Sequence, residues 1–126
     1  MAEKHDILNL EDVKLLVDSF YSKARENELL GPVFNEKIGD HWPEHLEKMV
    51  RFWQTLLLDK HTYSGNPLQH HLHLPISGEH FSEWLRMFHE TIDTFFVGEK
   101  AQEAHLRAAK ISLVMQTKLS QFNAGQ

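Results

Sequence analysis

The sequence of 126 residues predicts an all-α protein. Apolar residues recur every three to four positions in several long segments, which is the spacing of a helix that buries one face. Alternation of apolar and polar residues, which indicates a strand, is convincing nowhere. Residues that commonly begin or end helices stand at the borders of these segments. We therefore expect a single domain over residues 1–126, with short tails at about 1–9 and 123–126.

The first helix is expected to follow Asn9, its N-cap, with Glu11 and Asp12 in the first turn and an apolar face that starts at Val13. Gly31-Pro32 is expected to end it, because proline cannot continue a helix and restricts the residue before it. The apolar residues of this segment fall on one helical face: Val13, Leu16, Val17, Phe20, Tyr21 and Ala24.

Three further helices are expected. One begins near Pro43, because proline is well tolerated in the first helical turn. Another begins at about Glu79, with Ser77 as its N-cap. The last covers about residues 99–122. Their apolar faces contain, in chain order, Met49, Phe52, Trp53, Leu56, Phe81, Trp84, Leu85, Phe88, Ile92, Phe95, Phe96, Ala104, Ala108, Ile111, Met115 and Leu119.

The segment 59–76 is a long connection for a compact helical domain, and long connections often carry function. Asn66-Pro67 can open a short helical turn within it, and Pro75 can end that turn. The turn would carry three histidines toward whatever the segment covers: His70, His71 and His73.

Composition excludes several classes of protein. Lys and Arg number 13 against 18 Asp and Glu, a net charge of −5 with no basic run, so we expect no nucleic-acid partner. The absence of cysteine excludes disulfides, thiolate catalysis, iron–sulfur clusters and zinc sites built on cysteine. No apolar stretch reaches the ~18 residues of a membrane helix, and the N-terminus lacks a signal-peptide core, so we expect no membrane partner and a cytoplasmic protein.

One short motif suggests a zinc protease. His41-Trp42-Pro43-Glu44-His45 matches the H-x-x-E-H pattern, which needs both histidines on one helical face. If Pro43 opens the helix, His41 lies before it and the two rings do not share a face. Neither a G-x-S-x-G elbow nor a glycine-rich phosphate loop is present, so a serine hydrolase and a nucleotide-binding enzyme are also disfavoured.

The predicted helices could together enclose an apolar pocket with few polar tips, which describes a buried ligand site. A flat, aromatic, iron-bearing cofactor would suit such walls. Haem iron takes one neutral imidazole as its protein ligand, and Tyr, His and Trp can donate hydrogen bonds on the opposite side. Taken alone, each of these side chains fits an ordinary core or solvated residue at least as well as a ligand contact, and most of them fit it better.

Taken together, the residues from about Leu10 to Phe122 resemble the truncated haemoglobins of group III. The order and spacing of the shared motifs are specific, although no single motif is. In chain order these motifs are Phe20-Tyr21, Leu30-Gly31-Pro32-Val33-Phe34, Trp42-Pro43-Glu44-His45, Phe52-Trp53, Tyr63-Ser64-Gly65-Asn66-Pro67-Leu68, His71-Leu72-His73-Leu74-Pro75 and Phe81-Ser82-Glu83-Trp84.

The resemblance implies a truncated globin fold, a two-over-two helical sandwich around haem b. It makes His71 the proximal iron ligand, because the family places this ligand immediately before Leu-x-Leu-Pro. Tyr21, His45 and Trp84 become the polar set on the distal side, where a gas ligand is held. The other residues expected around the cofactor are Phe20, Phe34, Met49, Phe52, Trp53, Leu68, His70 and Phe88.

The expected function is reversible binding of dioxygen, and of other diatomic gases such as NO and CO, as in oxygen transport. Two alternatives stay open. A polar distal pocket also suits a haem enzyme of the nitric-oxide dioxygenase or peroxidase type, which would need a separate reductase because no flavin or nicotinamide motif is present. The many histidines also suit a non-haem helical protein that binds a divalent metal.

Overall fold

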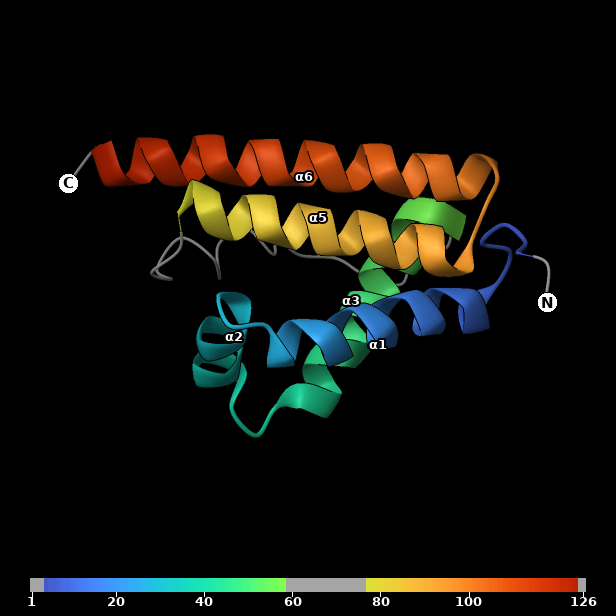
Figure 1. The fold of residues 1–126 in the computed structure, drawn as a ribbon, viewed down its shortest axis with the longest axis horizontal. Helices are drawn as coiled ribbons and strands as arrows, with labels where there is room; N and C mark the ends of the chain where they lie inside the picture. The colour runs from blue at the N-terminus through green and yellow to red at the C-terminus, as the bar shows by residue number, and fades with distance from the viewer. Residues whose placement is uncertain (1–3, 59–76, 125–126) are drawn as a thin grey trace.

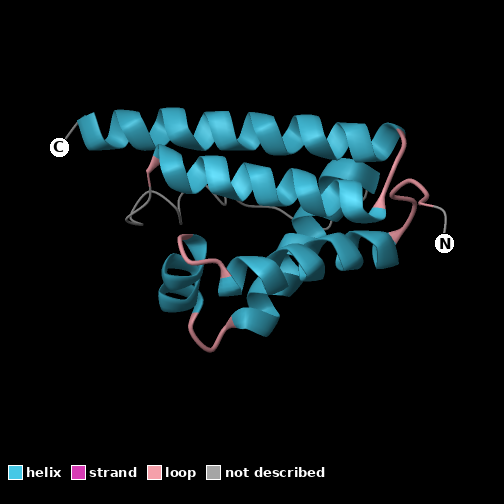
Figure 2. Ribbon diagram, in the orientation of Figure 1, coloured by secondary structure: helices cyan, strands magenta, loops and turns pink. Residues whose placement is uncertain are grey.

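The computed structural model describes residues 4–58 and 77–124 and confirms the all-α prediction. No residue in these two ranges belongs to a β-strand (Figure 2). The helices are α1 (Leu10–Glu26), α2 (Leu30–Ile38), α3 (Trp42–Leu58), α5 (Gly78–Phe95) and α6 (Glu99–Ala124).

The helices form two layers, as Figure 1 shows. Helices α5 and α6 lie along each other in one layer, and α1 crosses α3 in the other. The two layers meet where α1 packs on α5 and α3 on α6, while the short α2 lies against α1. This arrangement is the expected two-over-two sandwich.

The predicted end of the first helix is wrong. Helix α1 begins as expected, with the Asn9 side chain accepting a hydrogen bond at its N-terminus, but it ends at Glu26 rather than at Gly31-Pro32. The Asn27 side chain turns the chain by accepting hydrogen bonds from two following backbone N–H groups, both at 2.9 Å. Pro32 then falls in the first turn of α2, where its missing N–H removes no helical hydrogen bond. The apolar pattern had not indicated this extra helix.

Gly31 is needed at a close approach of two backbones. A Cβ atom at this position would lie 2.6 Å from the carbonyl oxygen of Arg25. A larger residue would therefore push α2 away from the end of α1. Gly31 therefore allows the backbones of α1 and α2 to come close together, whereas the sequence alone suggested that it ends a helix.

The starts of the later helices are confirmed. Helix α3 begins at Trp42 with Pro43 in its first turn, so His41 lies outside the helix and the zinc-protease motif does not place its two histidines on one helical face. Ser77 is the N-cap of α5. Helix α6 begins at Glu99 and ends at Ala124.

The core lies between the two layers and contains the predicted helical faces. The largest side chains that are almost completely buried include Phe20, Leu16, Leu57, Phe88 and Ile92, from helices α1, α3 and α5. On α6 the buried face consists largely of small residues such as Ala104 and Ala108. These small side chains let α6 pack closely on its neighbouring helices. Close packing of this kind fixes how the helices present their aromatic side chains to the site.

The N-terminal segment, predicted to be part of a tail, holds the corner between α5 and α6. Gly98, just before α6, has φ 134°, and a Cβ there would lie 2.5 Å from Asp6 Cγ. Because Gly98 has no side chain to cap α6, the Asp6 carboxylate does so, accepting hydrogen bonds from the N–H groups of Lys100 at 2.9 Å and Ala101 at 2.8 Å. Next to Asp6, Ile7 is fully buried.

Replacing Asp6 with asparagine is expected to lower the free energy of unfolding at pH 7 by about 1 kcal/mol, because a neutral amide oxygen still accepts a hydrogen bond at the helix N-terminus but hydrogen bonds to a charged carboxylate are stronger. Burial raises the pKa of the Asp6 carboxyl, but three backbone hydrogen bonds and the Lys100 charge together bring this pKa below its usual value. The charged form therefore stabilises the fold above the unfolded-state pKa of about 3.9, and this stabilisation is lost as pH falls through the lower folded-state pKa.

Urea unfolding at several pH values measures this contribution. The parent and Asp6→Asn should differ most at neutral pH and converge below about pH 4. A difference that is equally large at acidic and neutral pH would show that the Asp6 charge does not act in this way.

Candidate functional site

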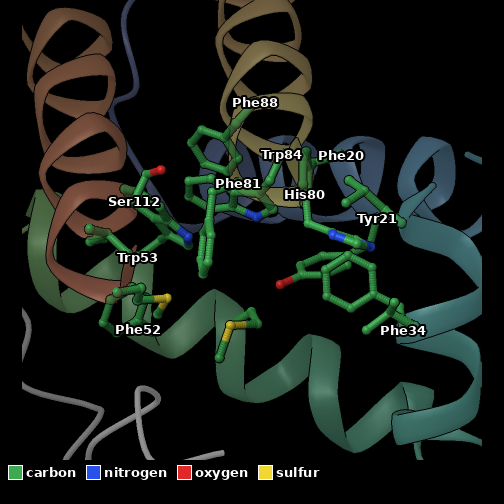
Figure 3. Close-up of a pocket in the computed structure, with 15 residues that line it drawn as sticks. Phe20, Tyr21, Phe34, Phe52, Trp53, His80, Phe81, Trp84, Phe88 and Ser112 are labelled. Carbon is green, nitrogen blue, oxygen red and sulfur yellow. The ribbon is translucent and has the colours of Figure 1, made fainter. Parts of the chain in front are cut away.

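A pocket lies between the two helical layers, lined by side chains from α1, α2, α3, α5 and α6. Figure 3 shows Tyr21 and Phe34 on one side of it and Phe52 and Trp53 on the other. The empty volume between these side chains is about 810 Å³, including the solvent-filled space at the open side of the pocket. The lining residues are Phe20, Tyr21, Leu30, Val33, Phe34, Met49, Phe52, Trp53, His80, Phe81, Trp84, Phe88, Ile111, Ser112 and Met115.

Tyr21 brings a hydroxyl group into this apolar space. Helix α1 fixes the residue on its buried face, only 8% exposed, and its hydroxyl oxygen points into the pocket in Figure 3. Burial raises the pKa of the Tyr21 phenol well above its usual range. The hydroxyl therefore keeps its proton at neutral pH and can donate a hydrogen bond to a ligand in the pocket.

Besides Phe20 of the same helix, whose ring centroid lies 5.0 Å away, three rings from α2 and α3 hold the Tyr21 ring by edge contacts. The ring centroids of Phe34, Trp42 and His45 lie 5.7, 5.8 and 5.2 Å from that of Tyr21. Such edge-to-face contacts fix the tilt of an aromatic ring and so the direction of its hydroxyl. His45 is half-buried, from the first turns of α3, and it touches Tyr21 without lining the pocket itself.

Trp42 was not predicted as a site residue. It is 6% exposed and packs against Tyr21, Phe34 and His45, while the Arg25 guanidinium covers its outer side at 4.4 Å from the ring centroid. The available signal was its place in the Trp42-Pro43-Glu44-His45 motif. Because it precedes a proline at the helix start, it was assigned only to the motif.

Stacked aromatic rings form the opposite wall. Phe88 lies between two indoles, with its centroid 5.3 Å from that of Trp84 and 4.8 Å from that of Trp53. The ring planes differ by only 17° and 23°. Phe20 adds an edge contact to Phe88 at 5.1 Å. The indole of Trp84 is half-buried at the pocket, so its N–H is a second potential donor there.

His80 also lines the pocket, although it was not among the residues expected around the cofactor. It is half-buried in the first turn of α5, and its Nδ1 accepts a hydrogen bond from the backbone N–H of Ser77 at 3.1 Å. An accepting Nδ1 leaves the ring proton of a neutral imidazole on Nε2. Helical spacing could not reveal this, because His80 stands one position before the apolar face that begins at Phe81.

Comparison with known proteins identifies the family. A sequence model of the bacterial-like globins matches residues 6–117. The chain is 35% identical over 123 residues to the group 3 truncated hemoglobin of Campylobacter jejuni, which covers 94% of this chain and 97% of that protein. The chain belongs to the bacterial-like globin family. It is therefore a haem-binding globin, and the resemblance to group III truncated haemoglobins is confirmed.

The structural comparison agrees for this globin. The crystal structure of a group III truncated hemoglobin from Campylobacter jejuni superimposes with a TM-score of 0.85 at 36% identity. The match covers 93% of this chain and 95% of that chain. The truncated globin fold predicted from the sequence is therefore confirmed over nearly the whole globin.

The pocket of this globin fits a haem. A haem is flat, aromatic and largely apolar, and most of the 15 lining residues are apolar or aromatic. The Tyr21 hydroxyl, the Trp84 indole N–H and the His80 ring place a few polar groups among them. A mostly apolar pocket that also contains a few hydrogen-bonding groups is typical of a ligand site. This lining therefore indicates a ligand that has polar atoms.

The globin brings together eight of the predicted site residues around this one pocket, and it places His45 beside Tyr21. Three predicted residues, the iron ligand His71 and its neighbours His70 and Leu68, lie outside the described residues, so their roles stay predictions. The eight pocket residues are Phe20, Tyr21, Phe34, Met49, Phe52, Trp53, Trp84 and Phe88.

Two further expectations concern metals and membranes. Within residues 4–58 and 77–124 there is no group of three or more His, Asp or Glu side chains that could hold a metal ion. The described helices of this globin also include none long and apolar enough to span a membrane.

Proposed function

We propose that this globin holds haem b and reversibly binds dioxygen, with NO and CO as further ligands, on the side of the pocket that carries Tyr21. When bound, the haem supplies the iron position at which a diatomic gas binds. The observation that carries the proposal is the Tyr21 hydroxyl, which is protonated, buried and directed into an apolar pocket.

The residues divide the work. We propose His71 as the proximal ligand of the iron, on the strength of the family motif. Tyr21 is the strongest donor to the gas ligand, because its ring is held at three edges and its hydroxyl is shielded from water. Trp84 is the second donor. His45 lies beside Tyr21 near the start of α3. There it can contact the gas ligand or control the entry of the gas into the pocket.

A haem enzyme of the nitric-oxide dioxygenase or peroxidase type is the second candidate. The number of donors at the pocket favours it, because simple storage of a gas needs fewer groups that can polarise an O–O bond. Catalysis would also consume electrons, and the chain lacks a flavin or nicotinamide motif, so a separate reductase would be its partner.

One experiment separates the two functions. The reduced, haem-loaded globin is exposed to air and then to argon, and the absorption spectrum is followed through both steps. Reversible binding predicts that the spectrum returns to its starting form without added reductant. If NO is instead consumed over many turnovers once a reductase is supplied, and the gas-bound form does not return under argon, the enzyme is the better description.

A further inference from the structure

Two histidines bridge α5 and α6 outside the pocket. The Nδ1 atoms of His89, on α5, and His105, on α6, lie in hydrogen-bond contact. Their ring centroids are 4.6 Å apart, and the ring planes differ by 33°. The other ring nitrogen of His105, Nε2, lies 2.8 Å from Oδ1 of Asp93. Neither histidine lines the pocket described above.

The Asp93 carboxylate orients His105 for coordination. A carboxylate only accepts hydrogen bonds, so His105 donates through Nε2–H, and its neutral form then carries a lone pair on Nδ1. This lone pair points toward His89. Histidines that bind metals in proteins very commonly donate their second ring N–H to a carboxylate in this way. His105 is therefore already held in the tautomer and orientation of a metal ligand.

The pKa of the His89 imidazole lies below its ordinary value, which favours the neutral form of this ring at pH 7. Burial lowers the pKa of its imidazole, the neighbouring His105 lowers it further, and the more distant charge of Asp93 only partly opposes them. In the metal-free pair, His89 donates its Nδ1 proton to His105. If this proton moves to Nε2 of the same half-buried ring, His89 offers a second nitrogen lone pair on the side facing His105.

We propose that His89 and His105 form a two-histidine site for a divalent transition-metal cation, which links α5 to α6, with Asp93 orienting one ligand. Imidazole nitrogen suits Zn²⁺, Cu²⁺ and Ni²⁺. With zinc at about 2.0–2.1 Å from each nitrogen, the two Nδ1 atoms of a tetrahedral site lie roughly 3.3 Å apart, so the two rings must move apart from their direct contact to admit the ion.

Water completes the coordination in this site. The part of the chain that the structure describes supplies no third protein ligand here, since it has no three-residue metal group. The side chain of Lys4 donates a hydrogen bond to the backbone carbonyl of Asp93 at 2.6 Å. Lys4 therefore does not compete with His105 for the Asp93 carboxylate. The site is therefore an exchangeable one, and occupancy stabilises the fold because the unfolded chain does not hold the two rings together.

Thermal unfolding of the haem-loaded globin with and without ZnCl2 tests the proposal. Saturating zinc should raise Tm by roughly 5 °C or more in the parent. The rise should disappear in His89→Gln and in His105→Gln. In Asp93→Asn both ligands remain, but about 10- to 100-fold more zinc should be needed to reach the rise that the parent shows. The Tm of each variant with zinc is compared with its own zinc-free Tm. A change in the stability of the zinc-free variant therefore does not affect the comparison.

His41→Gln is the matched control. The His41 side chain is 83% exposed and lies before α3, so this variant should keep the full rise. Any exposed imidazole can bind zinc, so the ring nitrogens are followed by ¹H–¹⁵N NMR of histidine-labelled protein, where zinc should shift the Nδ1 signals of His89 and His105. No rise in the parent, or an equal rise in both histidine variants with no such shift, would overturn the proposal.

Discussion

Replacing Tyr21 with phenylalanine is expected to speed dioxygen release about 10- to 150-fold. A hydrogen bond to a partly charged acceptor contributes ~1.5–3 kcal/mol, and this energy acts mainly on the dissociation rate. The phenylalanine ring keeps the edge contacts to Phe34, Trp42 and His45, so the pocket should keep its shape. The rate is measured by displacing dioxygen with excess CO and following the absorption change.

Trp84→Phe is the comparison variant for this prediction. It removes the indole N–H, the second donor, while a flat ring remains against Phe88. We expect it to speed release less than Tyr21→Phe does. An unchanged dissociation rate in Tyr21→Phe would remove Tyr21 from its proposed role, and a larger effect in Trp84→Phe would exchange the order of the two donors.

Replacing His71 with alanine is expected to abolish stable haem binding, and with it the Soret band of the purified globin. The iron needs one neutral imidazole from the protein, and no other residue of the chain fits the family motif for that position. The adjacent His70 is the matched control. Neighbouring side chains on a helical turn point ~100° apart, so only one of the two can face the iron without distortion.

His70→Ala should therefore retain the band at its original position. Free imidazole added to His71→Ala should restore a similar spectrum, because it can enter the space left by the side chain and supply the missing ligand. Loss of the band in His70→Ala together with its retention in His71→Ala would reverse the assignment of the proximal ligand.

Much of the fold could be predicted because each long helix has an amphipathic face. The buried series from Val13 to Ala24 and the start of α3 at Pro43 both follow from local rules. Helix α2 was missed because Gly31-Pro32 was interpreted only as a helix stop, although proline also fits the first turn of a helix. Its glycine is required by the approach of the Arg25 carbonyl, which is a contact between helices.

The same distinction separates the site residues that were predicted from those that were missed. Tyr21 and Trp84 stand on helical faces and in shared motifs, so both signals found them, and Phe88 was found by its helical face. Trp42 takes part through its packing on Tyr21 of another helix, and His80 takes part because the meeting of the helices brings it to the pocket wall. Such contacts depend on how the helices meet, which helical periodicity does not determine.

The N-terminal segment shows the same limit of local reasoning. Asp6 and Ile7 have no helical pattern around them, and so they appeared to belong to a tail. Ile7 is nevertheless fully buried, and Asp6 caps a helix that begins more than ninety residues later in the chain. Only the three-dimensional arrangement assigns these two residues a role in stability.

The most direct test of the account is an absorption titration of the purified globin with haem, before and after reduction with dithionite. The account predicts a Soret band that grows until one haem is bound per chain, and a spectrum that changes when dioxygen is then admitted. A chain that takes up no haem, or takes it up without saturating at one per chain, would contradict it and leave the pocket between the helical layers as ordinary core.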